Sequence, residues 1–173
     1  TSSTDGNRLR DANREGTRYN DSFVVLRPNR EGQHDAYLLR GSTYPGQASS
    51  SKSPDANGDG TGDVGMMRPG TYRVRPNGEF YGAASYRVRR TNGTTRLPGW
   101  RDTNHDGNFS AQERERSQTR GNTVSGILFH QGDAAAPNST GCQNLSPADF
   151  QNFIKAVGGE KASFTYTLLD AGR

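Results

Sequence analysis

The sequence predicts a mainly β or α+β domain with few helices and long polar loops. Three observations favour this class. Short apolar segments rich in β-formers alternate with turn residues, one segment has the capped periodicity of a helix, and 22 glycines and 8 prolines supply turns. A chain of 173 residues suffices for one domain. We expect a polar N-terminal arm over residues 1–20 and a single domain over residues 21–173.

Two strand pairs are expected in the first half of the chain. Residues 23–26 and 36–39 are apolar and flank polar turn residues, as in a β-hairpin. Residues 71–75 and 86–89 alternate apolar with polar side chains. Asn-Gly is a strong hairpin signal, so we expect the turn between them at Pro76-Asn77-Gly78. Further strands are predicted over residues 124–129 and 163–169.

One helix is clearly indicated after residue 146. Ser146 is a suitable N-cap, Pro147 suits the first helical position, and Gly158-Gly159 is a typical helix end. Between them the apolar residues recur at helical spacing, namely Phe150, Phe153, Ile154 and Val157. A weaker helix is expected over residues 110–118, and one helical turn over residues 11–15. Residues 41–70 and 91–123 are predicted to be two long irregular insertions, which need something to hold them.

Composition excludes several classes of protein. Only 29% of the residues are hydrophobic, but 22 basic and 18 acidic residues leave a net charge of just +4, so a small-cored folded domain is expected. No apolar run reaches the roughly 18 residues that span a bilayer. The single cysteine excludes an internal disulfide and a multi-cysteine zinc site. The surplus of basic residues favours an anionic partner.

The second insertion contains a candidate calcium loop that starts at residue 102. It matches the twelve-residue EF-hand pattern, with oxygen-bearing residues at positions 1, 3 and 5, glycine at position 6 and glutamate at position 12. His105 lies at a position that supplies no ligand, and we expect it to be exposed. The alternative is a solvated acidic turn before a helix. The predicted ligands are Asp102, Asn104, Asp106, Asn108 and Glu113.

The first insertion contains a related loop that starts at residue 55. Its first half has the same spacing, but position 12 is Met66, so the closing carboxylate is missing and Asp63 is expected to compensate. An ordinary Asn/Asp/Gly turn is the competing interpretation. The candidate ligands are Asp55, Asn57, Asp59, Thr61 and Asp63. We expect calcium in both loops to be structural, and we expect no organic cofactor.

A histidine and the cysteine form a candidate catalytic pair. His130 follows a predicted buried strand, and Cys142 comes twelve residues later, just before the predicted helix. A thiol needs a base to become a nucleophile, and His130 can serve if the loop between them folds back. The main-chain amides around Gly141 and Cys142 could then form an oxyanion hole. The alternative is a buried structural cysteine and a hydrogen-bonded histidine.

The segment around this pair resembles the signature of the L,D-transpeptidase (YkuD-type) catalytic domain. The similarity covers residues 127–145, and residues 68–72 resemble the strand entry of the family. The residues that carry it are Phe129-His130-x-Gly132 and Ser139-Thr140-Gly141-Cys142-x-Asn144-Leu145. The resemblance implies an L,D-transpeptidase-like β-sandwich with one helix after the cysteine. The family has a histidine where this chain has Thr140, and the acidic insertions are not typical of it, so a divergent branch is expected.

The resemblance also implies roles for individual residues. Cys142 would be the nucleophile, His130 its base, and the carbonyl of Gln131 would orient the imidazole. The implied reaction is acyl transfer on peptidoglycan stem peptides through a Cys142 thioester, outside the cytoplasm, although this chain starts at Thr1 and carries no signal segment. Structural or substrate-contacting positions would be those of Gly132, Ser139, Thr140, Gly141 and Asn144. Arg68 and Arg120 are candidates for pairing with a substrate carboxylate.

Two other functions remain open at this point. One is a non-catalytic, calcium-dependent module that binds the cell wall, supported by the acidic loops and the basic surplus. The other is a cysteine peptidase or amidase of another fold with the same pair of residues. Nucleic-acid binding is not expected, because strand alternation predicts arginines such as Arg87 and Arg89 on a solvent face, where soluble β-proteins commonly carry charge.

Overall fold

The computed structural model describes residues 18–107 and 109–170. Most of the predicted N-terminal arm, the helical turn over residues 11–15 and the predicted ligand Asn108 lie outside these residues. The described part is mainly β with two helices, which confirms the predicted class. Neither helix is long and apolar enough to cross a membrane.

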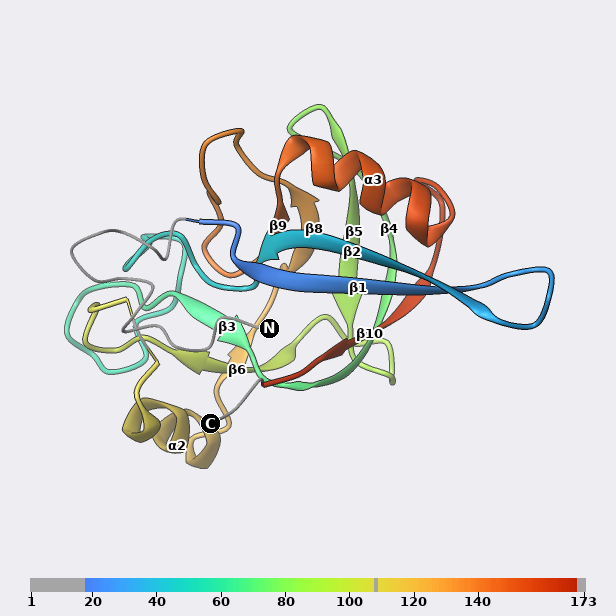
Figure 1. Cartoon of the computed structure of the whole chain (residues 1–173). Coiled ribbons are helices and arrows are strands. Elements are labelled where there is room, and N and C mark those ends of the chain that lie inside the picture. Colours follow the sequence, from blue (N-terminus) through green and yellow to red (C-terminus); the bar gives the residue numbers. More distant parts are fainter. Residues whose placement is uncertain (1–17, 108, 171–173) are drawn as a thin grey trace.

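The larger of two sheets has seven strands in the order β1-β2-β9-β8-β5-β4-β10 (Figure 1). Neighbouring strands are antiparallel except for β8 and β9, which are parallel. The strand bounds are β1 (Asp21–Pro28), β2 (His34–Ser42), β4 (Gly70–Phe80), β5 (Ala83–Arg89), β8 (Leu128–Gln131), β9 (Gln143–Leu145) and β10 (Phe164–Leu168). The hairpin predicted over residues 23–39 is confirmed as β1 and β2, and the last predicted strand as β10.

The expected turn at Pro76-Asn77-Gly78 was wrong. Strand β4 continues to Phe80, and the register with β5 shifts between Pro76 and Gly78, so Asn77 is the extra residue of a β-bulge. The chain instead reverses at Tyr81-Gly82, where φ is 51° and 77°. Two successive residues with positive φ are typical of the hairpin turn that suits the twist of paired strands.

A second sheet was not predicted. It has three strands in the order β3-β6-β7, and it is built from parts of the chain that the sequence suggested to be irregular. Glycines allow the strands to pack closely, because a Cβ at Gly65 or Gly99 would lie 2.6 Å from a side-chain carbon of Val124. Gly126, with φ of 72°, separates β7 from β8, so the strand expected over residues 124–129 is two strands. The bounds are β3 (Gly65–Met67), β6 (Leu97–Arg101) and β7 (Thr123–Val124).

Both predicted helices are present. Helix α2 (Ala111–Thr119) starts at Ser110, whose side chain forms a capping box with Glu113. Helix α3 (Pro147–Val157) starts at Ser146 and ends at Gly158, which has φ of 105°. In Figure 1, α3 lies along the large sheet, whereas α2 lies at the other end of the molecule beside β6.

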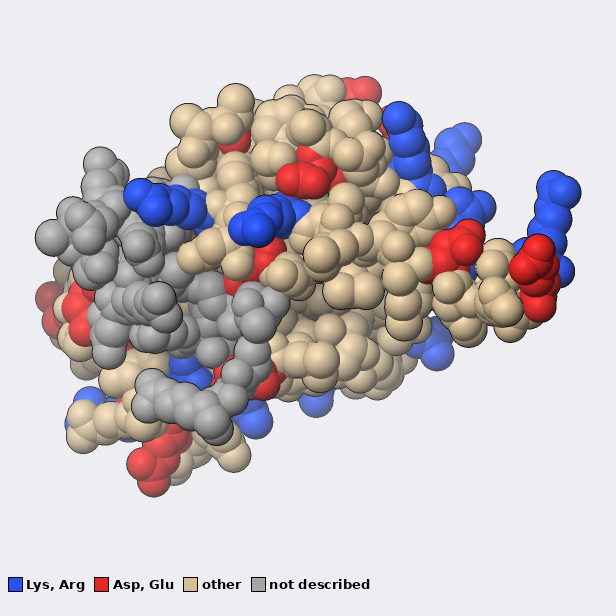
Figure 2. All heavy atoms as spheres, in the orientation of Figure 1, with Lys and Arg blue, Asp and Glu red and all other residues tan. Residues whose placement is uncertain are grey.

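The main core lies between α3 and one face of the large sheet. Phe150 and Phe153 of α3 are buried, and the Phe153 ring stacks on Phe129 of β8 with a centroid distance of 5.3 Å. Tyr86 of β5 packs edge-on against Phe153. In Figure 2 acidic and basic side chains are interspersed over the viewed face, including the tip of the β1–β2 hairpin. Helix α3 therefore covers the apolar face of the large sheet, and polar side chains can lie on the opposite face.

Candidate active site

The candidate catalytic residues lie on the sheet face opposite α3. Side chains alternate along a strand, so Phe129 of β8 and Gln143 of β9 point towards the core, while their neighbours point the other way. In the register of the parallel pair, Phe129 is opposite Gln143 and His130 is opposite Asn144. Two residues before Asn144, Cys142 lies on the same face. Strand pairing thus places a histidine and a cysteine on the same sheet face although eleven residues, most of them loop, separate them in the sequence.

Cys142 is partly exposed, and its thiol is hydrogen-bonded to the beginning of β8. The main-chain nitrogen of Leu128 donates to Sγ at 3.4 Å, and Sγ lies 3.8 Å from the carbonyl oxygen of Gly126. Burial raises the pKa of the thiol above its usual value, and the Leu128 amide and the Arg87 charge oppose this rise. The thiol is therefore protonated at neutral pH and needs a base, although solvent can reach the residue.

His130 is held in one tautomer by its own strand. Its Nδ1 lies 2.8 Å from the carbonyl oxygen of Gln131. A carbonyl oxygen only accepts hydrogen bonds, so Nδ1 carries the hydrogen and Nε2 is left as the base in the neutral ring. Burial lowers the pKa of His130, since only 4% of the residue is exposed. The ring of Phe80 packs against it edge-on, with centroids 4.8 Å apart. Imidazole is thus neutral and oriented near pH 7.

Asn144 fixes the position of this histidine from the neighbouring strand. Its Nδ2 lies 3.1 Å from both ring nitrogens and 3.3 Å from the carbonyl oxygen of His130. Its Oδ1 accepts a hydrogen bond from the main-chain nitrogen of Asn138 at 2.9 Å. With the hydrogen on Nδ1, only Nε2 and the His130 carbonyl can accept from this amide nitrogen, and these bonds satisfy a fully buried amide that would otherwise be costly to bury. The residue ties the loop that precedes Cys142 to the imidazole.

The thiol and the imidazole are diagonal neighbours on this face. The sulfur lies towards the start of β8, near Gly126 and Leu128, whereas the imidazole lies towards its end. Among the hydrogen bonds of the described residues, none joins the two side chains. The fold therefore places His130 of β8 and Cys142, which directly precedes β9, on one face of the sheet without a hydrogen bond between them.

The loop before Cys142 is shaped by a serine and a glycine. The Ser139 hydroxyl donates to the carbonyl oxygen of Cys142 at 3.0 Å and accepts weakly from the Gly141 nitrogen at 3.4 Å. Gly141 has φ of 143°, and a Cβ there would lie 2.2 Å from the carbonyl oxygen of Gly65. Thr140 is exposed, whereas Gly132 is buried below the hydroxyl of Tyr19. Ser139 and Gly141 thus set the backbone that carries the thiol.

Sequence reasoning missed Arg87 as a neighbour of the thiol. Arg87 of β5 is opposite Leu128 of β8, on the sheet face that carries Cys142. Its Nε donates to Oδ1 of Asn77 at 2.8 Å, and Nδ2 of Asn77 donates to Ser85 at 3.0 Å. The β-bulge therefore places the Asn77 side chain within hydrogen-bond distance of Arg87. The alternation of side chains along β5 could have predicted which face Arg87 lies on, but not that β5 would pair with β8.

The earlier candidate Arg120 lies elsewhere. Its guanidinium donates to the carbonyl oxygen of Ala56 at 3.1 Å, so it braces the first acidic loop. The main-chain nitrogen of Arg68 donates to the carbonyl oxygen of Pro98 in β6, and its carbonyl oxygen accepts from the Tyr72 hydroxyl in β4. The backbone of Arg68 thus helps to join the two sheets. The structure thus places Arg87, and not Arg120, on the sheet face that carries Cys142.

The two acidic loops have similar backbones and lie side by side. Positions 4 and 6 have positive φ in both loops, at Gly58 and Gly60 in the first and at His105 and Gly107 in the second. His105 is not fully exposed, contrary to expectation, because its Nε2 lies 2.8 Å from Oδ1 of the buried Asp63. Nδ2 of Asn57 also donates to the carbonyl oxygen of Thr103 at 2.7 Å. The insertions therefore form one linked unit.

The predicted ligand carboxylates accept hydrogen bonds from their own loops. Asp55 accepts from Gly58 and Gly60, and these main-chain bonds lower its pKa. Asp59 accepts from Asn57 and from the Thr61 nitrogen, and its pKa is lowered as well, chiefly by the Asn57 side chain. One carboxylate oxygen of Asp63 accepts a hydrogen bond from the Ala56 nitrogen, and the other lies next to Nε2 of His105 in the second loop.

In the second loop, Asp102 accepts from the Gly107 nitrogen at 2.8 Å, and Asn104 is linked to Asp106. Glu113 accepts from Thr103 through one oxygen and from Ser110 through the other. Within residues 18–107 and 109–170, no group of three or more His, Cys, Asp or Glu side chains is arranged around a shared metal position. The Asp, Asn and Glu side chains of the loop nevertheless supply the oxygen donors that calcium prefers.

Comparison with known proteins identifies no relative of this chain. No protein-family model matches the chain, and neither the curated proteins nor the solved structures include a significant match.

Proposed function

We propose that the chain is a cysteine acyltransferase that acts on peptidoglycan stem peptides, as an L,D-transpeptidase or L,D-carboxypeptidase. The observation that carries the proposal is that His130 of β8 and Cys142, which directly precedes the parallel strand β9, share one sheet face, with the imidazole Nδ1 held by the carbonyl oxygen of Gln131. The resemblance of residues 127–145 to the L,D-transpeptidase signature supplies the reaction and its substrate.

In the proposed reaction, Nε2 of His130 removes the proton of the Cys142 thiol. The thiolate attacks the carbonyl carbon of the third stem residue, and the terminal D-amino acid leaves as an amine that takes the proton from the imidazole. A thioester remains on Cys142. Attack by the amine of a second stem gives a cross-link and restores the thiol, whereas attack by water gives the shortened stem.

The contacts of the thiol indicate how the reaction would start. Sγ must leave the Leu128 amide for the imidazole, and this amide then becomes available near the reacting carbonyl. Arg87 supplies a positive charge that stabilises the thiolate, since it is one of the groups that lower the thiol pKa. Nε2 would exchange the Asn144 amide for the thiol proton, while Asn144 keeps its bond to the His130 carbonyl.

The direct test is incubation with a disaccharide-tetrapeptide, with product analysis by mass spectrometry. We expect loss of one D-alanine for hydrolysis, dimers for transfer, or both. Cys142→Ala should abolish product formation while the melting temperature stays close to that of the wild type. Thr140→Ala is a matched control, since this side chain is exposed in the same loop. Wild-type protein that leaves the tetrapeptide intact under all acceptor conditions would refute the proposal.

The alternatives give different results in the same experiment. A wall-binding module would bind peptidoglycan equally well as wild type and as Cys142→Ala, and would yield no product from either. A peptidase or amidase would cleave a different bond, and the product masses identify that bond.

We further infer that calcium stabilises the two acidic loops. The supporting observation is their shared backbone, with positive φ at the same two loop positions, and the oxygen donors that both loops carry. Asp102, Asp106 and Glu113 would hold the ion in the second loop, with Glu113 exchanging main-chain partners for the metal. Calcium there would order the insertions and take no part in the acyl transfer.

Calorimetric titration of chelator-treated protein tests this inference. We expect a binding heat and a rise of several degrees in melting temperature, because a ligand of the folded state stabilises it. Glu113→Gln should remove most of the heat, whereas Glu115→Gln, an exposed change in the same helix, should not. A wild-type titration without heat or a shift in melting temperature would contradict calcium binding.

A further inference from the structure

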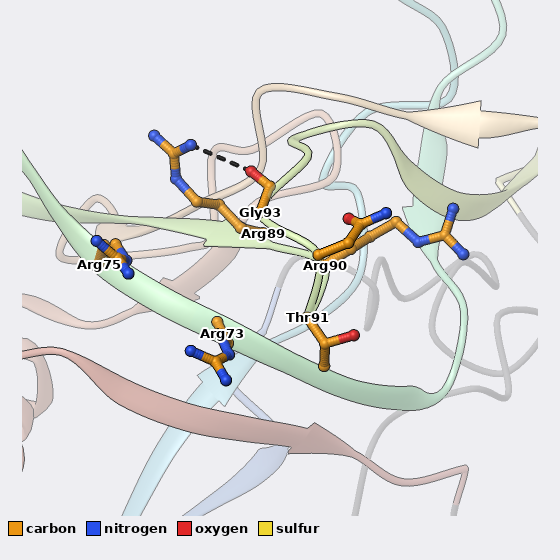
Figure 3. Close-up of a pocket in the computed structure, with 7 residues that line it drawn as sticks. Arg73, Arg75, Arg89, Arg90, Thr91 and Gly93 are labelled. Carbon is orange, nitrogen blue, oxygen red and sulfur yellow. Dashed lines mark hydrogen bonds between the residues drawn. The ribbon is translucent and has the colours of Figure 1, made fainter.

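A cavity lined by arginines lies at the end of the β4–β5 hairpin that is remote from the turn at Tyr81-Gly82. Its volume is about 430 Å³ (Figure 3). Strand β4 supplies Arg73 and Arg75, and the end of β5 supplies Arg89 and Arg90, while the rest of the lining consists of small polar residues and a glycine. These four arginines are called the arginine cluster below.

The arginine cluster concentrates positive charge at a cost to the fold. Arg73 is directly opposite Arg89 in the strand register, and like charges in this position destabilise a sheet. Among the described residues, the ion pairs are His105 with Asp59 and with Asp63, and Arg114 with Asp170, so none of them neutralises the cluster. An anionic ligand bound in the cavity would compensate the positive charge that no ion pair of the described residues neutralises.

One member of the cluster is partly pre-organised. Nη1 of Arg89 donates to the carbonyl oxygen of Gly93 at 3.2 Å, the contact drawn in Figure 3. Gly93 has φ of 90° and closes a tight turn through its nitrogen and the carbonyl oxygen of Arg90. Nε of Arg89 is buried without a hydrogen-bond partner in the described structure. A donor left unsatisfied in a buried position is costly unless a ligand or water occupies the site.

The chemistry of the cluster favours repeated phosphate groups. All its cations are guanidinium groups, whose planar fork matches phosphate oxygens, and Arg73 and Arg75 follow each other on one strand face about 6.6 Å apart. Single-stranded nucleic acid is bound with aromatic rings on which bases stack, but no aromatic ring lines this cavity. We propose that the arginine cluster binds a linear polyanion of repeating phosphates without nucleobases.

This site is distinct from the thiol and does not depend on the proposed enzymatic activity. Arg87, the neighbour of Cys142, is two residues from Arg89 on the same face of β5, so a bound polymer would lie along the face that carries the candidate active site. The cluster would thus hold the protein on a phosphate polymer while the thiol acts nearby.

Binding of labelled inorganic polyphosphate to the full chain, measured by fluorescence anisotropy at several salt concentrations, tests the proposal. We expect saturable binding that weakens as salt increases. Arg73→Gln with Arg89→Gln should weaken binding at least tenfold and reduce the salt dependence. Arg30→Gln with Arg40→Gln removes the same charge from exposed positions of the β1–β2 hairpin and should change binding less than twofold.

Competition identifies the source of the phosphates. Displacement by poly(glycerol phosphate) would assign the site to a phosphodiester polymer, and displacement by unlabelled polyphosphate alone would assign it to free polyphosphate. Stronger competition by single-stranded DNA or polyglutamate would overturn the proposal, as would absence of binding or an equal loss in the control pair. Melting curves verify that both pairs fold. Cys142→Ala should bind polyphosphate like the wild type, which separates failure of this site from failure of the acyltransferase.

Discussion

Asn144 of β9 holds His130 of β8 through a side-chain nitrogen that lies 3.1 Å from both imidazole nitrogens and 3.3 Å from the histidine carbonyl oxygen. The two residues are opposite each other in the parallel pair. This side-chain contact adds to the strand pairing that links the histidine to the segment carrying the cysteine.

Asn144→Ala should therefore reduce turnover and stability together. Removing the amide takes a hydrogen-bond partner from the buried His130 carbonyl and from the part-buried Asn138 nitrogen, which costs about 1–3 kcal/mol in the free energy of unfolding. Urea unfolding and product formation from the tetrapeptide measure the two effects. Asn138→Ala keeps the main-chain donor and should be close to wild type; equal losses in both variants would contradict the assignment.

The reactivity of Cys142 should rise with pH over the neutral and alkaline range. Burial raises the thiol pKa, so the thiolate fraction, and with it the rate of alkylation by iodoacetamide, grows as pH increases. Arg87→Gln removes a charge that lowers this pKa, so its alkylation profile should shift to higher pH. Arg96→Gln is exposed and should leave the profile unchanged. A profile that does not depend on Arg87 would show that its charge does not reach the sulfur.

Turnover should also fall in acid. Burial lowers the pKa of His130, so the folded protein disfavours the protonated ring and His130 remains a base below the usual histidine range. The acid limb of kcat/KM should consequently lie below pH 6.5. An acid limb above that value would mean that another group controls it.

Tyr81→Asn should stabilise the protein. Tyr81 is 89% exposed and has φ of 51°, which disfavours a bulky residue, whereas Asn-Gly is preferred in this type of turn. The expected gain is about 1 kcal/mol, or roughly 2–4 °C in melting temperature. The Tyr81 ring packs edge-on against Phe80 with centroids 4.5 Å apart, and both substitutions lose this contact; Tyr81→Ala gains no favoured turn residue, so it should not stabilise. A lower melting temperature for Tyr81→Asn than for Tyr81→Ala would refute the turn argument.

Gly141→Ala should destabilise the protein much more than Gly32→Ala. Both glycines have positive φ, but a Cβ at residue 141 would lie 2.2 Å from the Gly65 carbonyl oxygen, whereas one at residue 32 meets nothing within 4 Å. We expect about 1 kcal/mol at residue 32 from the backbone alone and at least about twice that at residue 141. Urea unfolding measures both, and similar values would show that the loop before Cys142 can move aside.

The sequence predicted elements whose signals are local. Helix α3 was found from its cap, its apolar stripe and its terminal glycine, and the β1–β2 hairpin from two apolar runs around a turn. The turn at Asn77-Gly78 was misplaced because a bulge depends on the pairing of β4 with β5. Strands β3 and β6 were missed, and β7 was merged with β8, because these strands are short and their stability comes from partners distant in the sequence.

His130, Cys142 and the acidic spacing could be named as candidates from residue types alone, because a base near a thiol and regularly placed oxygens are the residue types that such chemistry needs. Tertiary structure decided what surrounds them: the face shared by His130 and Cys142, the approach of Arg87, the contact between His105 and Asp63, and the arginine cluster. The contact between His105 and Asp63 depends on two loops packing together. The other features depend on strand register, which joins residues far apart in the chain and is fixed only when the whole sheet packs against its core.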